Sequence, residues 1–172
     1  MRPALAGLLV AAVAACKGDG SSDPAGGAGG GAAASASQSK AAAPAGKMRL
    51  RDAPPEGDVD GIVRAELKTT RRENRRLLVY VGATWCEPCQ RFHHAAERGE
   101  LDATFPDVDM VTFDLDRDNE RLASAGYVSK LIPLFALPGP DGRASGKQIE
   151  GGIKGEGAVG YIAPRLQKML AE

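Results

Sequence analysis

Two cysteines separated by two residues, Cys86 and Cys89, are the side chains best suited to chemistry in this chain. Thiols at this spacing can close a disulfide or contribute to a metal site. A structural zinc site normally needs two further Cys or His ligands at matching spacing, and the sequence has no second such pair. Its only histidines, His93 and His94, lie just after the cysteines. We therefore predict thiol–disulfide exchange, with no metal site and no cofactor beyond a redox-active disulfide.

The pair lies between a predicted strand and a predicted helix. Residues 77–81 form an apolar, β-prone run, which predicts a buried strand, and residues 85–89 form the turn into a helix that runs to about residue 98. Unpaired N–H groups and the helix dipole stabilise an anion at a helix N-terminus, so Cys86 is the predicted nucleophile. Cys89, one turn further in, is predicted to resolve the mixed disulfide. Pro88 lies in the first turn, where its missing N–H costs little.

The remaining elements follow from apolar spacing and turn signals. Residues 56–74 carry apolar side chains at helical spacing, which predicts an amphipathic helix. Further elements are a strand at 109–115, a short helix at 118–125, a strand at 134–137, a returning strand at 147–153 and a closing helix at 157–170. The short turn between the last two strands makes them antiparallel.

The run from residue 77 to Cys89, a strand followed by Trp-Cys-Glu-Pro-Cys, resembles the thioredoxin family, and so does Ile132-Pro133 before the predicted hairpin. The resemblance covers residues 56–172. It implies a thioredoxin-like α/β fold, with a central mixed sheet of about four strands flanked by helices on both faces. It also implies that Pro133 is cis and packs opposite the cysteines, and that the backbone of Ile132 pairs with substrate. We expect Trp85 at the rim of the site, touching substrate.

Three residues are expected to tune the thiols, namely Tyr80, Glu87 and Pro88. The first two depart from the family pattern. Tyr80 occupies the position of the family's buried acid, which helps to move a proton at the resolving thiol; the Tyr80 hydroxyl or water would have to substitute. Glu87 replaces a glycine between the cysteines. A carboxylate beside Cys86 disfavours its thiolate, so we expect a more reducing couple.

The N-terminus predicts export. Arg2 precedes an apolar run at residues 4–15, which is too short to span a bilayer and fits a signal peptide. The run ends Val13-Ala14-Ala15-Cys16, which resembles the bacterial lipobox. We predict a lipoprotein signal peptide at residues 1–15 and lipidation of Cys16; the alternative is an ordinary secretory signal with Cys16 incidental. Lys17 after the cysteine favours the outer membrane, with the domain facing the periplasm.

Residues 16–55 contain Cys16 and a segment rich in Gly, Ala and Ser, which predicts a flexible tether. Residues 56–172 are then the thioredoxin-like domain. Lys plus Arg equals Asp plus Glu, 22 of each, so the charge does not indicate a nucleic-acid partner. The basic run at 71–76 fits a solvated helix end. Of the two histidines, we expect His93 to pack beside Phe92 and His94 to face solvent.

The leading hypothesis is a monomeric, membrane-tethered reductase of disulfides in exported proteins, recharged by a membrane electron donor. A second hypothesis is a disulfide oxidase or isomerase. A third is a copper-handling protein in which the cysteine pair and a histidine bind copper(I). A fourth is a scaffold lipoprotein whose disulfide is inert.

Overall fold

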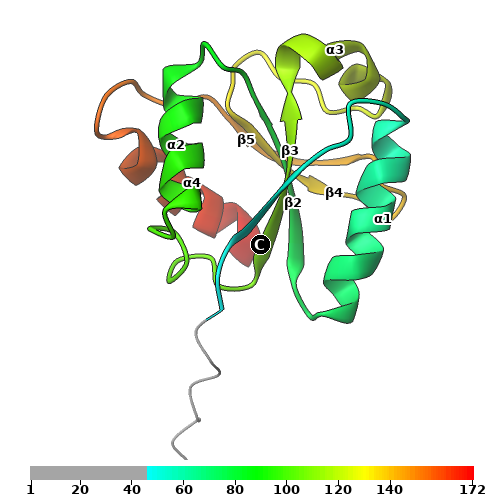
Figure 1. Ribbon diagram of the computed structural model, residues 1–172, viewed down its shortest axis with the longest axis horizontal. Helices are drawn as coiled ribbons and strands as arrows, with labels where there is room; N and C mark the ends of the chain where they lie inside the picture. The colour runs from blue at the N-terminus through cyan, green and yellow to red at the C-terminus, as the bar shows by residue number, and fades with distance from the viewer. Residues whose placement is uncertain (1–45) are drawn as a thin grey trace, which may run out of the picture. The chain divides into compact units, whose positions relative to one another are not determined.

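A five-stranded mixed sheet forms the centre of residues 46–172, the part of the chain that the computed structural model describes (Figure 1). The predicted signal peptide, Cys16 and the first part of the predicted tether lie outside the described residues. The strand order is β1-β3-β2-β4-β5, in which β1, β3 and β2 are parallel, β4 pairs antiparallel with β2, and β5 pairs antiparallel with β4. The strands are β1 (Arg49–Asp52), β2 (Arg76–Gly82), β3 (Val108–Asp114), β4 (Leu134–Pro138) and β5 (Ala144–Glu150).

Four helices cover the two faces of this sheet, α2 and α4 on one and α1 and α3 on the other (Figure 1). They are α1 (Val59–Arg72), α2 (Glu87–Glu97), α3 (Leu115–Ser124) and α4 (Ala158–Ala171). The element order and strand pairing confirm the predicted thioredoxin-like α/β fold. None of the helices between residues 46 and 172 is long and apolar enough to cross a membrane.

Each face of the sheet has its own apolar core. Phe92 of α2 lies edge-on to Phe135 of β4, with ring centroids 4.7 Å apart, and α4 adds Ile162 to this core. On the other face, Val63 of α1 and Phe113 of β3 share the second core with residues of α3. Full burial of one such side chain contributes about 1.5–3 kcal/mol, so the two cores fix the helices on the sheet.

The structure adds a fifth strand, β1, to the sheet of about four strands expected from the sequence, and this strand lies in the segment predicted as tether, residues 16–55. β1 pairs in parallel with β3 from Arg49 opposite Asp109 to Asp52 opposite Thr112, and Met48 before it is buried. The strand was missed because its sequence, Arg-Leu-Arg-Asp, carries a single apolar residue and follows a Gly/Ala/Ser-rich run. The domain therefore begins several residues earlier than predicted.

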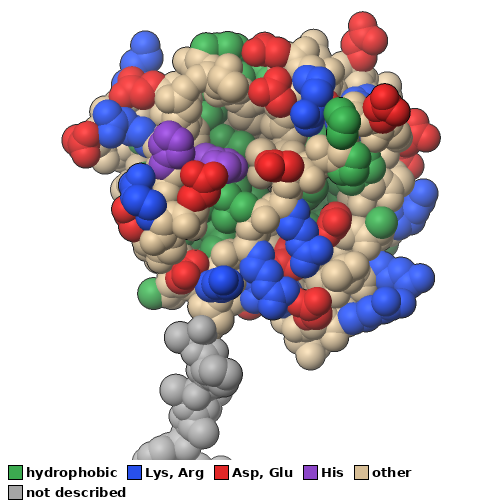
Figure 2. All heavy atoms as spheres, in the orientation of Figure 1, with side chains coloured by type: hydrophobic (Ala, Val, Ile, Leu, Met, Phe, Trp, Pro, Cys, Tyr) green, Lys and Arg blue, Asp and Glu red, His purple; other side chains and the backbone are tan. Residues whose placement is uncertain are grey.

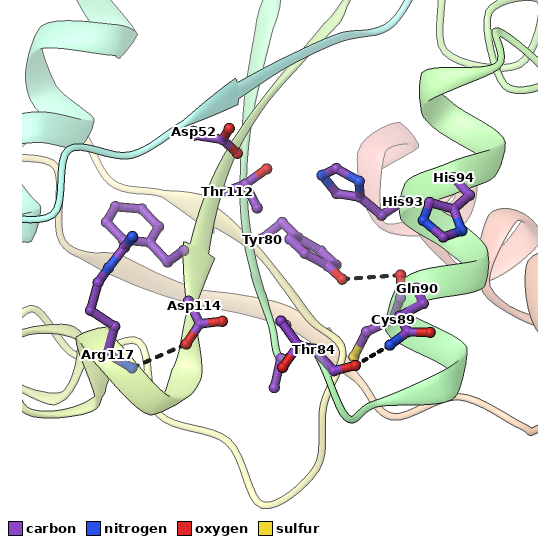
Figure 3. Close-up of a pocket in the computed structure, with 13 residues that line it drawn as sticks. Asp52, Tyr80, Thr84, Cys89, Gln90, His93, His94, Thr112, Asp114 and Arg117 are labelled. Atoms are coloured by element: carbon purple, nitrogen blue, oxygen red, sulfur yellow. Dashed lines mark hydrogen bonds between the residues drawn. The ribbon is translucent and has the colours of Figure 1, made fainter.

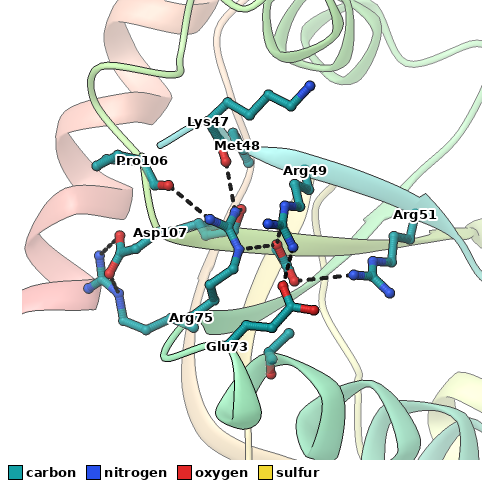
Figure 4. A network of polar contacts seen from close by, with 12 residues as sticks. Lys47, Met48, Arg49, Arg51, Glu73, Arg75, Pro106 and Asp107 are labelled. Carbon is teal, nitrogen blue, oxygen red and sulfur yellow. Dashed lines mark hydrogen bonds and ion pairs between the residues drawn. The ribbon is translucent and has the colours of Figure 1, made fainter. Parts of the chain in front are cut away.

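A buried carboxylate, Asp109 on β3, explains how so polar a strand is held (Figure 4). Its Oδ1 lies 2.6 Å from Arg75 Nε, and its Oδ2 lies 3.5 Å from Arg51 Nη2. Arg75, which precedes β2, also donates to the carbonyls of Lys47, Pro106 and Val108. The basic run at 71–76 is therefore not wholly a solvated helix end. Arg75 instead connects β3, through Asp109, to the segment that leads into β1, through Lys47.

The structure begins α3 at Leu115, three residues before the predicted start. The Asp114 carboxylate accepts hydrogen bonds from the N–H groups of Asp116 and Arg117, at 2.9 and 3.1 Å, and so caps the helix. Asp118 is buried within the first turn. Burial raises the pKa of Asp118, but hydrogen bonds from Arg117 and Arg121 outweigh it and the net pKa is lowered.

Candidate active site

Cys86 and Cys89 form a disulfide at the start of α2, with an S–S distance of 2.02 Å. Cys86 is the N-cap residue of this helix, and the N–H of Cys89 points to its Sγ at a distance of 3.3 Å. Glu87 and Pro88 begin the helix, so the proline removes an N–H that has no partner in the helix. After reduction, the same Cys89 N–H is placed to donate to a thiolate at Cys86, which favours the charged form.

A groove of about 400 Å³ opens beside Cys86. Trp85, Leu131 and Ile132 are among the residues that line it. Trp85 is 65 % exposed and Leu131 60 %, which is unusual for large apolar side chains. The Trp85 indole N–H donates to Asp116 Oδ2 at 2.9 Å and holds the ring at the rim. The peptide bond between Ile132 and Pro133 is cis. The structure thus brings together the residues predicted to meet substrate.

Glu87 does not present a bare carboxylate to Cys86. Its Oε1 lies 3.0 Å from Arg91 Nε and accepts a hydrogen bond from the Gly155 N–H at 3.1 Å. The bond from Arg91, followed by that from Gly155, lowers the pKa of Glu87, so this group is charged at neutral pH. Arg91 also pairs with Glu156. Because Arg91 offsets part of the charge, we expect Glu87 to disfavour the Cys86 thiolate less than an isolated carboxylate would.

A second cavity, of about 330 Å³, lies on the other side of the disulfide, against Cys89 (Figure 3). Tyr80 projects into it from β2, and its hydroxyl donates to the carbonyl oxygen of Cys89 at 3.3 Å. Tyr80 is buried, and this burial raises its pKa above the usual range. The hydroxyl is therefore neutral at physiological pH, and it does not replace a carboxylate as a proton acceptor.

His93, which was expected to be packed, is mostly covered and also lines this cavity. Its side chain is 25 % exposed, and its ring centroid lies 6.2 Å from that of Tyr80. The Nδ1 atom lies 3.3 Å from Glu97 Oε1. His94 is exposed, as expected, and also borders the cavity. The sequence indicated that His93 lies near the cysteines, because a residue four positions after Cys89 falls on the same face of α2.

Within residues 46–172, no group of three or more His, Cys, Asp or Glu side chains is arranged to hold a metal ion. Two of the acidic residues near the site have other partners. Asp114 caps α3, and Asp116 accepts from Trp85.

No family model and no curated protein matches the chain. Solved structures similar to it include a poplar thioredoxin h, at 21% identity and a TM-score of 0.46, covering 73% of this chain and 95% of that one. A thioredoxin from Nicotiana alata is 18% identical, with a TM-score of 0.46, and covers 75% of this chain and 94% of that one. Spinach chloroplast thioredoxin f is also 18% identical, with a TM-score of 0.44, and covers 74% and 87%. Because these sequence identities and TM-scores are low, the activity of this chain has to be argued from its own residues.

Those residues support thiol–disulfide oxidoreductase activity. The disulfide lies at a helix N-terminus, where the helix dipole favours a thiolate at Cys86 after reduction, and the second sulfur lies one turn deeper. Both cysteines are nearly covered, at 5 % and 2 % exposure, and an apolar groove reaches the first. A disulfide held only for rigidity needs neither the groove nor the rim of exposed apolar side chains.

Proposed function

We propose that this chain is a membrane-tethered thiol–disulfide oxidoreductase that reduces disulfides in exported proteins through Cys86 and Cys89. The observation that carries the proposal is the placement of the Cys86–Cys89 disulfide at the N-cap of α2, beside a groove bordered by Trp85 and Leu131. An apolar rim of this kind suits a polypeptide client, because partly unfolded chains expose apolar side chains near their cysteines.

The proposed reaction starts from the reduced protein. The Cys86 thiolate attacks one sulfur of a client disulfide, forming a mixed disulfide and releasing the other client sulfur as a thiolate. The Cys89 thiolate then attacks Cys86 Sγ, which forms the Cys86–Cys89 disulfide and releases the second client thiolate. Two electrons pass to the client. A membrane dithiol donor then reduces the Cys86–Cys89 disulfide by the same exchange.

The direction of electron flow rests on Glu87. Its carboxylate is charged and adjacent to Cys86, which disfavours the thiolate and with it the reduced form. The Arg91 partner weakens this effect without reversing it, because the Cys86 neighbour remains an anion in an ion pair and not a cation. A couple with a less favoured reduced form donates electrons more readily.

Insulin reduction by the full chain tests the activity. With dithiothreitol as the electron source, wild type should precipitate the insulin B chain well above the uncatalysed rate, whereas Cys86→Ser should not. In a separate assay without dithiothreitol, reduced Cys89→Ser should trap a mixed disulfide between Cys86 and the client, because no second thiol releases it. The matched control is Cys16→Ser, which leaves the disulfide intact. Equal rates for wild type and Cys86→Ser would contradict the proposal and favour an inert disulfide.

The tether is tested separately. Wild type expressed in a diderm bacterium should take up labelled fatty acid and partition with membranes, and Cys16→Ser should do neither. Uptake by neither variant would favour an ordinary secretory signal, and equal uptake by both would show that the lipid is not attached to Cys16. The full chain titrated with copper(I) addresses the metal alternative, since tight binding combined with no insulin reduction would favour copper handling.

A further inference from the structure

The exchange steps described above assign no role to the cavity against Cys89. The attack of Cys89 on Cys86, however, requires that a proton leave Cys89. Cys89 must lose its thiol proton before it can attack Cys86, and Cys89 is only 2 % exposed. The cavity of about 330 Å³ is far larger than one water molecule needs, and it is lined by Cys89 and by exposed residues such as Thr84 and Gln90. It is therefore a route by which water reaches the buried thiol.

From its geometry, we infer that His93 accepts the proton from Cys89 through water in this cavity. Glu97 contacts Nδ1 of the ring at 3.3 Å, and among residues 46–172 no ion pair or hydrogen bond involves Nε2. Histidine is the side chain whose ordinary pKa lies near neutrality, so it can both take up and release a proton under physiological conditions. Figure 2 shows both histidines of the chain together on this face of the molecule. The inference rests on the proposed function, since it assigns a role within the same reaction.

The other charged or titratable groups around the cavity are less suited to this role. Tyr80 is held neutral by burial, which raises its pKa. The Asp114 carboxylate is engaged by the N–H groups that it caps. Arg117 is a cation paired with Asp118. The remaining groups are His94, which is exposed, Asp52 on β1, also exposed, and Glu97.

Asp52 is the competing acceptor. It is paired across the sheet with Thr112, which in turn is paired with Tyr80, so all three side chains lie in one row on the same face (Figure 3). The Thr112 hydroxyl has no hydrogen-bond partner in the described residues, which fits a water-lined cavity. Asp52 lies at the far end of this row, two strands from Tyr80. His93 lies on the helix that carries Cys89, four residues away.

The balanced step is a proton transfer followed by exchange. The Cys89 S–H bond breaks, and its proton passes through water to Nε2 of His93, leaving a thiolate. This thiolate forms the bond to Cys86 Sγ as the bond from Cys86 to the client sulfur breaks, and the client leaves with the electron pair. The His93 imidazolium then returns its proton to solvent or to the departing thiolate.

Dithiobis(nitrobenzoate) separates this step from the first attack. The full chain is used with Cys16→Ser, so that only two thiols react. Reduced protein should release one coloured thiolate when Cys86 attacks, and a second when Cys89 resolves the mixed disulfide. The second phase is intramolecular and should not depend on reagent concentration. The Cys89→Ser variant should show only the first phase.

In wild type, the rate of the second phase should show a second ionisation in addition to that of the thiol, as general-base catalysis requires. His93→Gln should lose this ionisation and slow the second phase at least about tenfold near neutral pH, which is a modest general-base effect. Added imidazole should restore part of the rate. Glu97→Gln, at an exposed position, should give a smaller loss. The first phase and the matched control His94→Gln should be unchanged.

A His93→Gln variant with the wild-type rate and pH profile would overturn the inference. So would a loss that imidazole does not restore, or a loss that appears in Asp52→Asn in place of His93→Gln. Absence of the second phase from wild type would instead refute the proposed function itself, so the two failures are distinguishable.

Discussion

Replacement of Arg75 by methionine should destabilise the domain strongly, although Arg75 belongs to a run of arginines that is mostly exposed. Its side chain is 9% exposed, and Nε lies 2.6 Å from the Asp109 carboxylate, which is completely buried. The substitution keeps the aliphatic stem but removes this ion pair and the hydrogen bonds to three backbone carbonyls. Arg51 and Arg49 remain near Asp109, at 3.5 and 4.0 Å, but neither makes a hydrogen bond to it.

Removal of one partner from a buried ion pair costs about 3–5 kcal/mol, because the other charge is left buried. A domain of roughly 130 residues has an unfolding entropy of about 0.27 kcal/mol/K near 60 °C. The expected decrease in Tm is then about 11–18 °C. Such a loss is a large fraction of the 5–15 kcal/mol that is typical of a domain of this size.

Urea and thermal unfolding of the full chain, followed by circular dichroism, would measure the effect. The matched control is Arg49→Met, because Arg49 pairs with the exposed Glu73 and is itself 39% exposed. An exposed pair contributes about 1 kcal/mol or less, so the control should shift Tm by less than about 4 °C. Equal shifts in the two variants would show that Asp109 does not depend on Arg75, and would refute this account of how β1 is held.

Three further predictions concern the site and its supports. Glu87→Gln should raise the reduction potential by roughly 20 mV, as measured against glutathione, and an unchanged or lower potential would contradict the tuning role. Glu156→Gln is the control, because it removes one partner of Arg91 but keeps the Glu87 carboxylate. Trp85→Ala should lower kcat/KM for insulin roughly fivefold to thirtyfold, as for an interface anchor, but should leave the rate with a small disulfide unchanged; equal losses would exclude a docking role. Asp118→Asn should be less stable than wild type at pH 7. Because folding lowers the pKa of Asp118 from 3.8, the difference in unfolding free energy should shrink as pH falls below that value, and a constant difference would contradict this.

The parts of the fold with strong local patterns were predictable from the sequence. Val59, Val63 and Leu67 follow helical spacing and are all buried in α1. The apolar run in β2 is buried on both faces, as expected for an inner strand between β3 and β4. The cysteine pair, placed between this strand and the next helix, was sufficient to predict a disulfide, and the structure contains it.

The features that the sequence did not predict depend on contacts between segments that are distant along the chain. β1 has one apolar residue, and its arginines are accommodated only because Asp109, on a strand more than fifty residues later, lies between them. No local pattern shows that an aspartate in an apolar strand will be buried with such partners. For His93, helical spacing put it on the Cys89 face, but a cavity at that face forms only when β1 and β3 pack beside α2.

The direction in which β1 runs determines how this domain can be attached to a surface or to another protein. β1 runs parallel to β2, and β2 leads directly into Trp85 and Cys86. The chain therefore enters at one end of the sheet, and the reacting sulfur lies beyond the other, a strand length of about 20 Å away. The last helix finishes at the entry end as well, since Arg76 at the start of β2 donates to the carbonyl of Leu170 (Figure 1). A surface, a fusion partner or an immobilising tag joined directly at residue 46 or at the C-terminus would meet the end of the domain opposite the reacting sulfur and leave that sulfur accessible.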